Sequence, residues 1–187
     1  KHLEQICRIS VNLKVQMSIM LCGIGMGSSD TMTNEVERAI QNADILLGAE
    51  RMIRPYSAKI DKQPFYRTEQ IIPYLKTIAN SGASAFSERE IRVVILFSGD
   101  SGFFSGAQSL YRALSEEIEL GTIDGTVHIL PGISSISYLA SLTGESYHDA
   151  QSLSMHGREI VNLASRIAAN RKTFLLTNGA SSLRELG

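Results

Sequence analysis

The stretch Ile91–Gly106, "IRVVILFSGDSGFFSG", carries the strongest fold signal in the chain. Its first seven residues are apolar and mostly β-branched except for Arg92. Such a run is typical of a strand in a parallel sheet that is covered on both faces. A glycine-rich segment with one acidic residue, Asp100, follows directly. Because ligands of open α/β sheets bind beyond the carboxyl ends of the strands, the stretch predicts a buried strand and a ligand-binding loop.

Strand-like and helix-like segments alternate on both sides of this stretch. The apolar runs predict strands over residues 18–24, 44–48, 62–66, 91–99 and 126–132. Helical spacing of apolar residues predicts helices over residues 30–43, 68–82, 101–118 and 133–144. Repeated alternation of this kind predicts an α/β fold with a mainly parallel sheet in the N-terminal domain.

The pattern restarts after residues 145–150. Strands are expected over 151–157 and 172–179, with a helix over 159–171 and the start of another at 180. We therefore expect an N-terminal α/β domain over 17–145 and a smaller, incomplete C-terminal α/β domain over 146–187. Residues 1–16 have no clear period; they are either foreign to the natural protein or a natural extension, and we assign them no function.

Composition narrows the class of protein. The chain has 187 residues, 43% of them hydrophobic and 20% charged, as in a soluble globular protein. A formal net charge of −1 gives no basic field for nucleic acid. Cys7 and Cys22 lack metal-site spacing, so no zinc site is expected. No apolar run suits a membrane span or a signal peptide, and we expect a cytoplasmic protein.

A second glycine-rich segment, Gly23–Asp30 or "GIGMGSSD", invites comparison with the dinucleotide fingerprint G-x-G-x-x-G. Gly23 and Gly25 fit the first two places, but Ser28 stands at the third, and Glu50 lies two residues beyond the end of the second strand instead of at it. A tight turn would explain one or two glycines through their freedom to adopt positive φ. A third alternating glycine favours close approach of a ligand to the backbone.

A third loop, Pro131–Ser135 or "PGISS", again follows a predicted strand. Taken singly, each later loop has a simpler reading as a helix cap. Asp100 or Ser101 would cap one helix, and Ser134 or Ser135 the next. Three such loops after three strands instead favour one shared ligand site at the carboxyl edge of the sheet.

In order and spacing, "GIGMG", "SGDSGFFSG" and "PGISS" resemble the loops of the tetrapyrrole methylase family over roughly residues 18–187. The resemblance implies a two-domain S-adenosylmethionine (SAM) methyltransferase with the cofactor between the domains. Segments 44–53, 154–159 and 175–179 are similar to the branch that methylates carbon 5 of a precorrin of the cobalt-precorrin-7 or precorrin-6Y type.

Three positions depart from the family pattern. The family places proline where this chain has Met26, aspartate where it has Ser28, and proline where it has Ser101. Because proline fixes φ, its loss is expected to loosen both loops slightly.

The resemblance also implies roles for individual residues. SAM would donate a methyl group to an electron-rich carbon, leaving S-adenosylhomocysteine, without a protein nucleophile or a metal. The expected cofactor contacts are Gly99, Asp100, Gly102, Phe103, Ser134, Ser135, Met155, Leu176, Thr177 and Asn178. The expected substrate contacts are Gly25, Met26 and Gly27, with Arg51, Arg54 and Arg158 as candidates for the substrate carboxylates. His156 is the candidate for proton transfer; a packed or surface histidine, and a solvated surface cation for each arginine, are the plain alternatives.

The family further implies a homodimer, a precorrin substrate and a separate protein that methylates carbon 15 and decarboxylates. Three alternatives stay open. The first is another member of the family, one that acts on a different corrin position or on diphthine. The second is a dinucleotide-dependent oxidoreductase, and the third is a nucleotide-binding regulatory module without catalysis.

Overall fold

The computed structural model describes residues 15–81, 90–155 and 160–177. Contacts within the chain divide it into two compact units that meet at Gly132 and Ile133. The helix Ser135–Thr143 is grouped with the second unit, so this division falls earlier in the chain than the domain boundary expected after residue 145.

The first unit contains a parallel sheet of five strands, which confirms the predicted α/β class. The strands are β1 (Gln16–Gly23), β2 (Ile45–Leu47), β3 (Asp61–Gln63), β4 (Ile91–Phe97) and β5 (Asp124–Leu130). Their order is β3-β2-β4-β1-β5, and every neighbouring pair runs parallel. β1 therefore lies between β4 and β5, which is not the 3-2-1-4-5 order of a dinucleotide-binding sheet.

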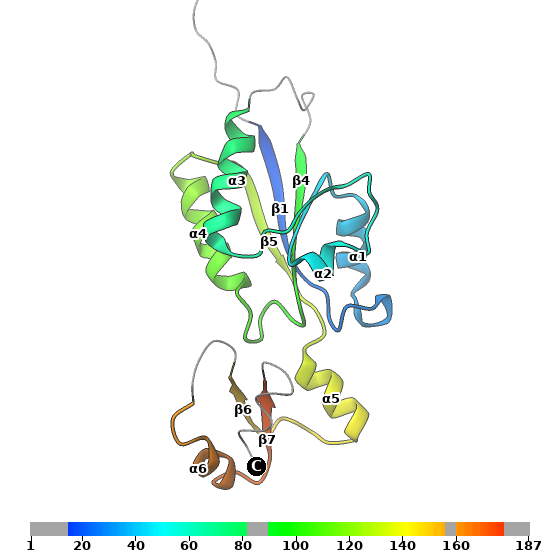
Figure 1. Ribbon diagram of the computed structural model, residues 1–187, viewed down its shortest axis with the longest axis vertical. Helices are drawn as coiled ribbons and strands as arrows, with labels where there is room; N and C mark the ends of the chain where they lie inside the picture. The colour runs from blue at the N-terminus through cyan, green and yellow to red at the C-terminus, as the bar shows by residue number, and fades with distance from the viewer. Residues whose placement is uncertain (1–14, 82–89, 156–159, 178–187) are drawn as a thin grey trace, which may run out of the picture. The chain divides into compact units, whose positions relative to one another are not determined.

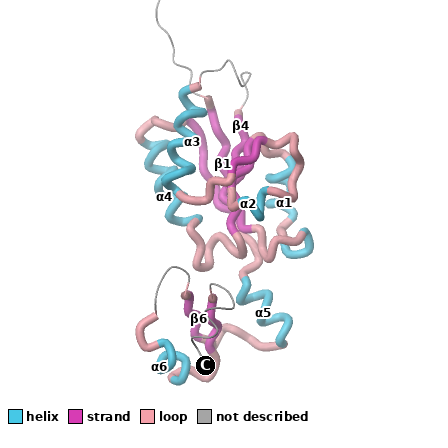
Figure 2. The backbone as a smooth tube through the Cα atoms, in the orientation of Figure 1, coloured by secondary structure: helices cyan, strands magenta, loops and turns pink. Residues whose placement is uncertain are grey.

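Helices cover both faces of this sheet (Figure 1, Figure 2). The helices are α1 (Asn34–Gln41), α2 (Glu50–Ile53), α3 (Thr68–Asn80) and α4 (Ala107–Glu119). One core cluster joins α3 and α4 to inward residues of β1, β2 and β4, such as Ile19 and Ile95. The opposite cluster joins α1 and α2 to Cys22, Leu46 and Val94. Burial on both faces explains why the strands read as continuous apolar runs.

Several predicted boundaries were wrong, for local reasons. α4 begins at Ala107, not at Ser101, because the preceding residues form a loop whose Ser105 Oγ accepts a hydrogen bond from Ala107 N at 3.2 Å. The helix expected from residue 30 is a short 3-10 turn, Ser29–Thr31, followed by α1. Thr33 caps α1 by accepting from Val36 N at 3.3 Å. β1 begins at Gln16, before the expected strand start at residue 18.

Cys22 is a core residue of β1. It is fully buried, and its Sγ donates a weak hydrogen bond to the carbonyl of Met20 at 3.8 Å. Burial, with a smaller contribution from the charge of Glu35, raises the pKa of the thiol to about 12. The thiol is therefore neutral at physiological pH and is not a nucleophile.

The second unit contains α5 (Ser135–Thr143), β6 (Gln151–Ser154), α6 (Leu163–Ala168) and β7 (Thr173–Leu176). β6 and β7 pair in parallel, with Gln151 opposite Thr173 and Ser154 opposite Leu176. α5 ends at Gly144, which has a φ of +68°, as its glycine predicted. Within 15–81, 90–155 and 160–177, no helix combines the length and the apolar character needed to cross a membrane.

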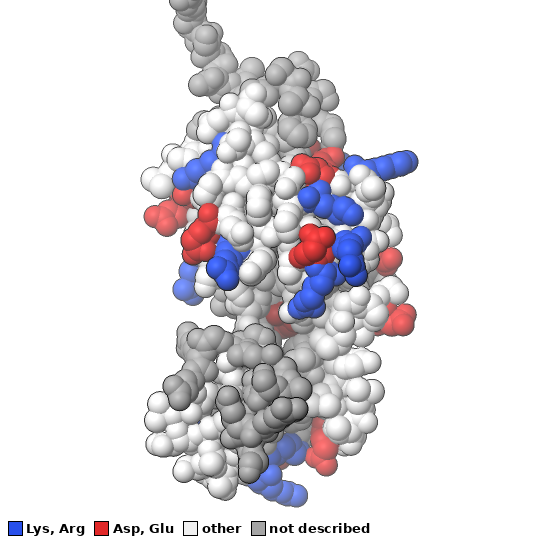
Figure 3. Space-filling view, viewed as in Figure 1, with Lys and Arg blue, Asp and Glu red and all other residues white. Residues whose placement is uncertain are grey.

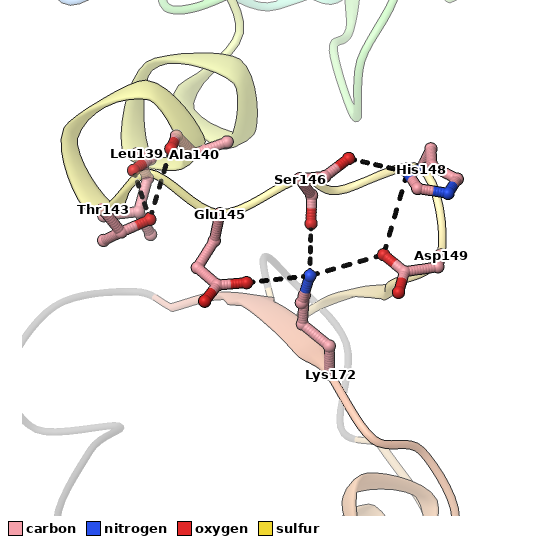
Figure 4. Close-up of polar contacts among 8 residues, drawn as sticks. All are labelled: Leu139, Ala140, Thr143, Glu145, Ser146, His148, Asp149 and Lys172. Atoms are coloured by element: carbon pink, nitrogen blue, oxygen red, sulfur yellow. Dashed lines mark hydrogen bonds and ion pairs between the residues drawn. The ribbon is translucent and has the colours of Figure 1, made fainter.

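Lys172, the residue before β7, bonds to the segment that follows α5 (Figure 4). Its Nζ lies 3.0 Å from Glu145 Oε2 and 3.4 Å from Asp149 Oδ1, and it donates to the carbonyl of Ser146 at 2.6 Å. The hydrogen bond to Glu145, and then the contacts with Asp149, raise the pKa of Lys172. The link holds the connection between α5 and β6 against the strand pair.

At the carboxyl edge of the first sheet, three backbones meet without room for side chains. A methyl group on Gly23 would lie 2.8 Å from both Gly132 N and Gly99 O. A methyl group on Gly132 would lie 2.3 Å from Gly99 O and 2.5 Å from Gly23 O. Glycine is required at these two positions by steric exclusion, since any Cβ would overlap a neighbouring backbone. The loops after β1, β4 and β5 are thereby joined at one point.

Replacing Gly132 by alanine is expected to lower the free energy of unfolding by about 3 kcal/mol or more, because backbone atoms on two other loops must move. Gly106→Ala is the matched control: its φ is −73°, and its added methyl group would meet only Phe97 Cε1, at 3.8 Å. That control should change stability by less than about 0.5 kcal/mol. Chemical denaturation measures the free energy of unfolding of both variants. Equal losses of stability in the two variants would contradict the close contact of the three backbones at Gly132.

Cys22 predicts a specific pH dependence of stability. Its pKa is raised from 9.0 to about 12 in the folded chain, so only the unfolded thiol ionises between these values. The free energy of unfolding of a Cys7→Ser variant should therefore fall more steeply from pH 9.0 upward than that of the Cys7→Ser, Cys22→Ala variant. Comparing the two profiles removes contributions from lysine and from tyrosines other than Tyr56, whose pKa is raised by burial and then by the charge of Cys22. Parallel profiles would show that the thiol is not buried as described.

Candidate functional site

The loop between β4 and α4 is organised by the side chain of Asp100. Its Oδ1 accepts hydrogen bonds from Gly102 N at 3.2 Å and from Gly132 N at 3.3 Å. Phe103 N donates to the carbonyl of Asp100 at 3.3 Å, which closes a turn. One carboxylate thus shapes its own loop and holds the loop after β5, across 32 residues of sequence. Asp100 does not cap α4, so that simpler reading was wrong.

The loop after β1 pairs with the loop after β4. Gly25 N donates to Gly99 O at 3.0 Å, and Gly99 N donates to Gly25 O at 2.8 Å, forming an isolated antiparallel bridge. Gly25 has a φ of +59°, and a methyl group there would lie 2.1 Å from the carbonyl of Thr31. The glycine is therefore required both by its conformation and by space. Two of the three predicted ligand loops are joined through backbone atoms alone.

Met26 stands where the family pattern has proline, and it forms a bond that proline lacks. Its backbone N–H donates to Thr31 Oγ1 at 3.0 Å. Thr31 is buried, and its hydroxyl in turn donates to the carbonyl of Ser28 at 3.1 Å. The Met26 side chain is 40% exposed. The loop that was expected to be loosened is thus fixed by the side chain of Thr31.

Ser101 departs from the family pattern in the same way. It is buried, and its Oγ donates to the carbonyl of Leu130 at 3.0 Å, at the end of β5. It does not cap α4. Together with Asp100 it gives the β4 loop two polar attachments to the β5 loop. A serine beside an acidic residue in a glycine-rich loop reads from sequence as a cap or a ligand contact, so this long-range bond could not be found there.

Parts of this edge leave backbone open to a ligand. A methyl group on Gly99, whose φ is +70°, or on Gly27, whose φ is +89°, would meet nothing within 4 Å. Gly102 is exposed and Phe103 is half-buried. Phe103 packs edge-to-face against Phe104, with ring centroids 4.8 Å apart. The edge therefore offers open peptide groups and aromatic surface, which suit a ligand with a polar tail and a flat ring.

The predicted site residues of the second unit that the structure describes fall into two groups. Ser134 is buried and caps α5 by accepting from Ser137 N at 3.2 Å, which is the simpler of its two readings; Ser135 is exposed in the first turn. Met155 N donates to Leu176 O at 2.9 Å, so these two residues and the adjacent Thr177 lie together at the carboxyl ends of β6 and β7. His156, Arg158 and Asn178 lie outside the described residues.

The candidate cations of the first unit lie on its surface. Arg51 is in α2, directly after β2, and Arg54 follows the helix; both are exposed. Basic side chains gather on the face that carries α2, interspersed with acidic ones (Figure 3). α2 follows the carboxyl end of β2, so the two arginines belong to the same edge of the sheet as the glycine loops.

In the described part of the chain, no three His, Cys, Asp or Glu side chains gather as a metal-binding group. Cys22, the one cysteine among the described residues, is a neutral core thiol. The helix after the first glycine loop begins only at Asn34, and Thr33 occupies its N-terminus, which does not favour a pyrophosphate on that helix.

Comparison with known proteins gives two curated relatives of note. The chain is 29% identical over 169 residues to a cobalt-precorrin-7 C(5)-methyltransferase of Salmonella typhimurium. The aligned region covers 89% of this chain and 75% of that protein. The chain is 26% identical over 168 residues to a precorrin-6Y C(5,15)-methyltransferase (decarboxylating) of Sinorhizobium sp, over 90% of this chain and 37% of that protein. The chain spans between 25% and 61% of the length of three of the curated relatives it matches.

Among solved structures, the precorrin-6Y methylase of Archaeoglobus fulgidus aligns with a TM-score of 0.59 at 17% identity, covering 90% of this chain and 77% of that one. At such low identity the likeness concerns the fold alone. The family model of the tetrapyrrole (corrin/porphyrin) methylases matches residues 18–186, a range that contains the loops after β1, β4 and β5. By the extent of that match, the chain belongs to the tetrapyrrole methylase family.

Proposed function

We propose that this chain is a SAM-dependent methyltransferase that methylates carbon 5 of a precorrin, of the cobalt-precorrin-7 or precorrin-6Y type. The names of the Salmonella and Sinorhizobium relatives support the position on the macrocycle. Membership of the tetrapyrrole methylases supports the reaction class.

The observation that carries the proposal is the fixed junction of three loops at one sheet edge. Asp100 Oδ1 joins the β4 loop to Gly132 N, and Gly25 and Gly99 pair with each other. A site held in this way has its backbone donors and acceptors aimed before a ligand arrives. Pre-organisation of this kind lowers the entropic cost of binding and of alignment.

The donor fits this edge in chemical type. SAM supplies an activated methyl group on a sulfonium, so the protein has to bind it, orient it and exclude water. Open backbone at Gly99, exposed Gly102 and the half-buried ring of Phe103 would receive it on the first unit. Ser135, Met155, Leu176 and Thr177 stay proposed contacts from the second unit. Ser134 would contribute through its backbone, because its hydroxyl caps α5.

The acceptor would use the other predicted residues. Gly25, Met26 and Gly27 form the loop that we assign to the macrocycle, with the exposed Met26 side chain as an apolar contact. Arg51 and Arg54 would meet substrate carboxylates, for which the planar guanidinium is well suited. We further propose a cytoplasmic homodimer, with methylation at carbon 15 and decarboxylation carried out by a separate protein. The rival dinucleotide-dependent reading has less support, given the strand order and the capped α1.

Asp100→Ala is expected to weaken binding of S-adenosylhomocysteine by about tenfold or more, because two charge-assisted hydrogen bonds to backbone N–H groups are lost. Asp100→Asn is the matched control: its amide oxygen can accept the same two bonds, so affinity should stay within about threefold. Calorimetric titration of the wild type and both variants measures this. Unchanged affinity in Asp100→Ala removes the residue from the site, and wild-type binding of NAD without S-adenosylhomocysteine overturns the cofactor assignment.

Methyl transfer tests the acceptor. With SAM labelled in its methyl group and a precorrin-7-type acceptor, label should appear on the macrocycle at carbon 5, as read by NMR. Arg51→Ala should raise KM for the acceptor by a few-fold with kcat little changed, because it removes a contact to a carboxylate that does not react. Label at another carbon would assign the chain to another branch of the family. Binding of SAM with no transfer to any corrin precursor would contradict the proposal.

A further inference from the structure

Phe104 adopts a backbone conformation that phenylalanine seldom takes. Its φ is +48°, in the left-handed region, where the Cβ of most residues crowds the backbone. Among the residues that the structure describes, Asn162 is the one other non-glycine residue with positive φ, and asparagine tolerates that region well. Phe104 therefore carries a conformational cost that its residue type does not explain.

Burial does not offset that cost. The Phe104 side chain is 56% exposed, although large apolar residues normally gain stability by leaving water. Its aromatic contact is with its neighbour Phe103, at an interplanar angle of 74° and a centroid separation of 4.8 Å. Strain at an exposed position is retained mainly where it serves a functional site. An exposed ring on a strained residue therefore calls for something that covers it.

The loop on both sides of Phe104 is anchored. Before it, Asp100 accepts from Gly102 N and turns the chain through the bond from Phe103 N to its carbonyl. After it, Ser105 Oγ accepts from Ala107 N at the start of α4. The ring thus stands at the tip of a fixed loop, at the carboxyl edge that carries the Gly25–Gly99 bridge. A pre-positioned ring loses little entropy when a ligand packs on it.

We infer that Phe104 is a ligand-binding residue whose ring packs against a flat, conjugated ring bound at this edge. The inference rests on the proposed function, which offers two sources of such a ring: the adenine of SAM and the macrocycle of the acceptor. Phe104 supplies affinity and selection for planarity. It has no part in bond making, since its side chain holds no titratable or nucleophilic group.

The decisive variant separates strain from binding. Phe104→Asn removes the ring but keeps a residue that tolerates positive φ, so its melting temperature should be unchanged or higher than that of the wild type. Its affinity for the ring-bearing ligand should nevertheless fall by about fivefold or more. Phe104→Tyr keeps the ring and should bind within about twofold of the wild type. A residue with only a structural role would lose stability and affinity together.

Two probes identify the source of the ring. S-adenosylhomocysteine reports the adenine, and cobyrinic acid, a stable corrin that bears carboxylates, reports the macrocycle. Calorimetry of the wild type, Phe104→Asn and Phe104→Tyr with each probe gives the answer. A loss with either probe supports the inference and names the ring. If the wild type binds a probe and Phe104→Asn binds both as well as the wild type, the inference is overturned while the proposed function stands; if the wild type binds neither, both fall.

Discussion

Contact between three backbones at Gly23, Gly99 and Gly132 is the constraint on which the carboxyl edge depends. At Gly23 and Gly132 the peptide groups of neighbouring loops lie closer than a Cβ would permit. This closeness follows from the strand order, because β1 lies between β4 and β5 and the loops of all three leave the sheet side by side. Once the backbones meet, hydrogen bonds between Gly25 and Gly99, and from Gly132 to Asp100, become possible.

The polar side chains of this edge act mainly on its own backbone. Asp100, Ser101 and Thr31 each bond to a peptide group of a loop, and Ser134 caps a helix. What remains open is peptide backbone around Gly27 and Gly99 together with the exposed side chains of Met26 and Phe104. Under the proposed function, such a surface suits a cofactor that brings its own reactive group, since alignment and exclusion of water would then carry the catalysis.

How much of this could be read from the sequence depends on the range of the interactions. The strands and their parallel class follow from local runs such as Ile91–Phe97, whose apolar residues need cover on both faces. The start of α4 was misplaced because Ser105, rather than Asp100 or Ser101, bonds to its first turn. The place of β1 in the sheet and the bond from Asp100 to Gly132 join residues far apart in sequence. No periodicity encodes those, so they required the structure.

Met26 and Ser101 stand where the family pattern has proline, and they show that a similar loop sequence can be made rigid in a different way. Proline would hold φ at the positions of Met26 and Ser101 through its ring, independently of its neighbours. In this chain the same loops are held by Met26 N on Thr31 Oγ1 and by Ser101 Oγ on the carbonyl of Leu130. Rigidity that depends on a partner is lost when the partner changes. Thr31 is therefore as necessary to the first loop as its glycines.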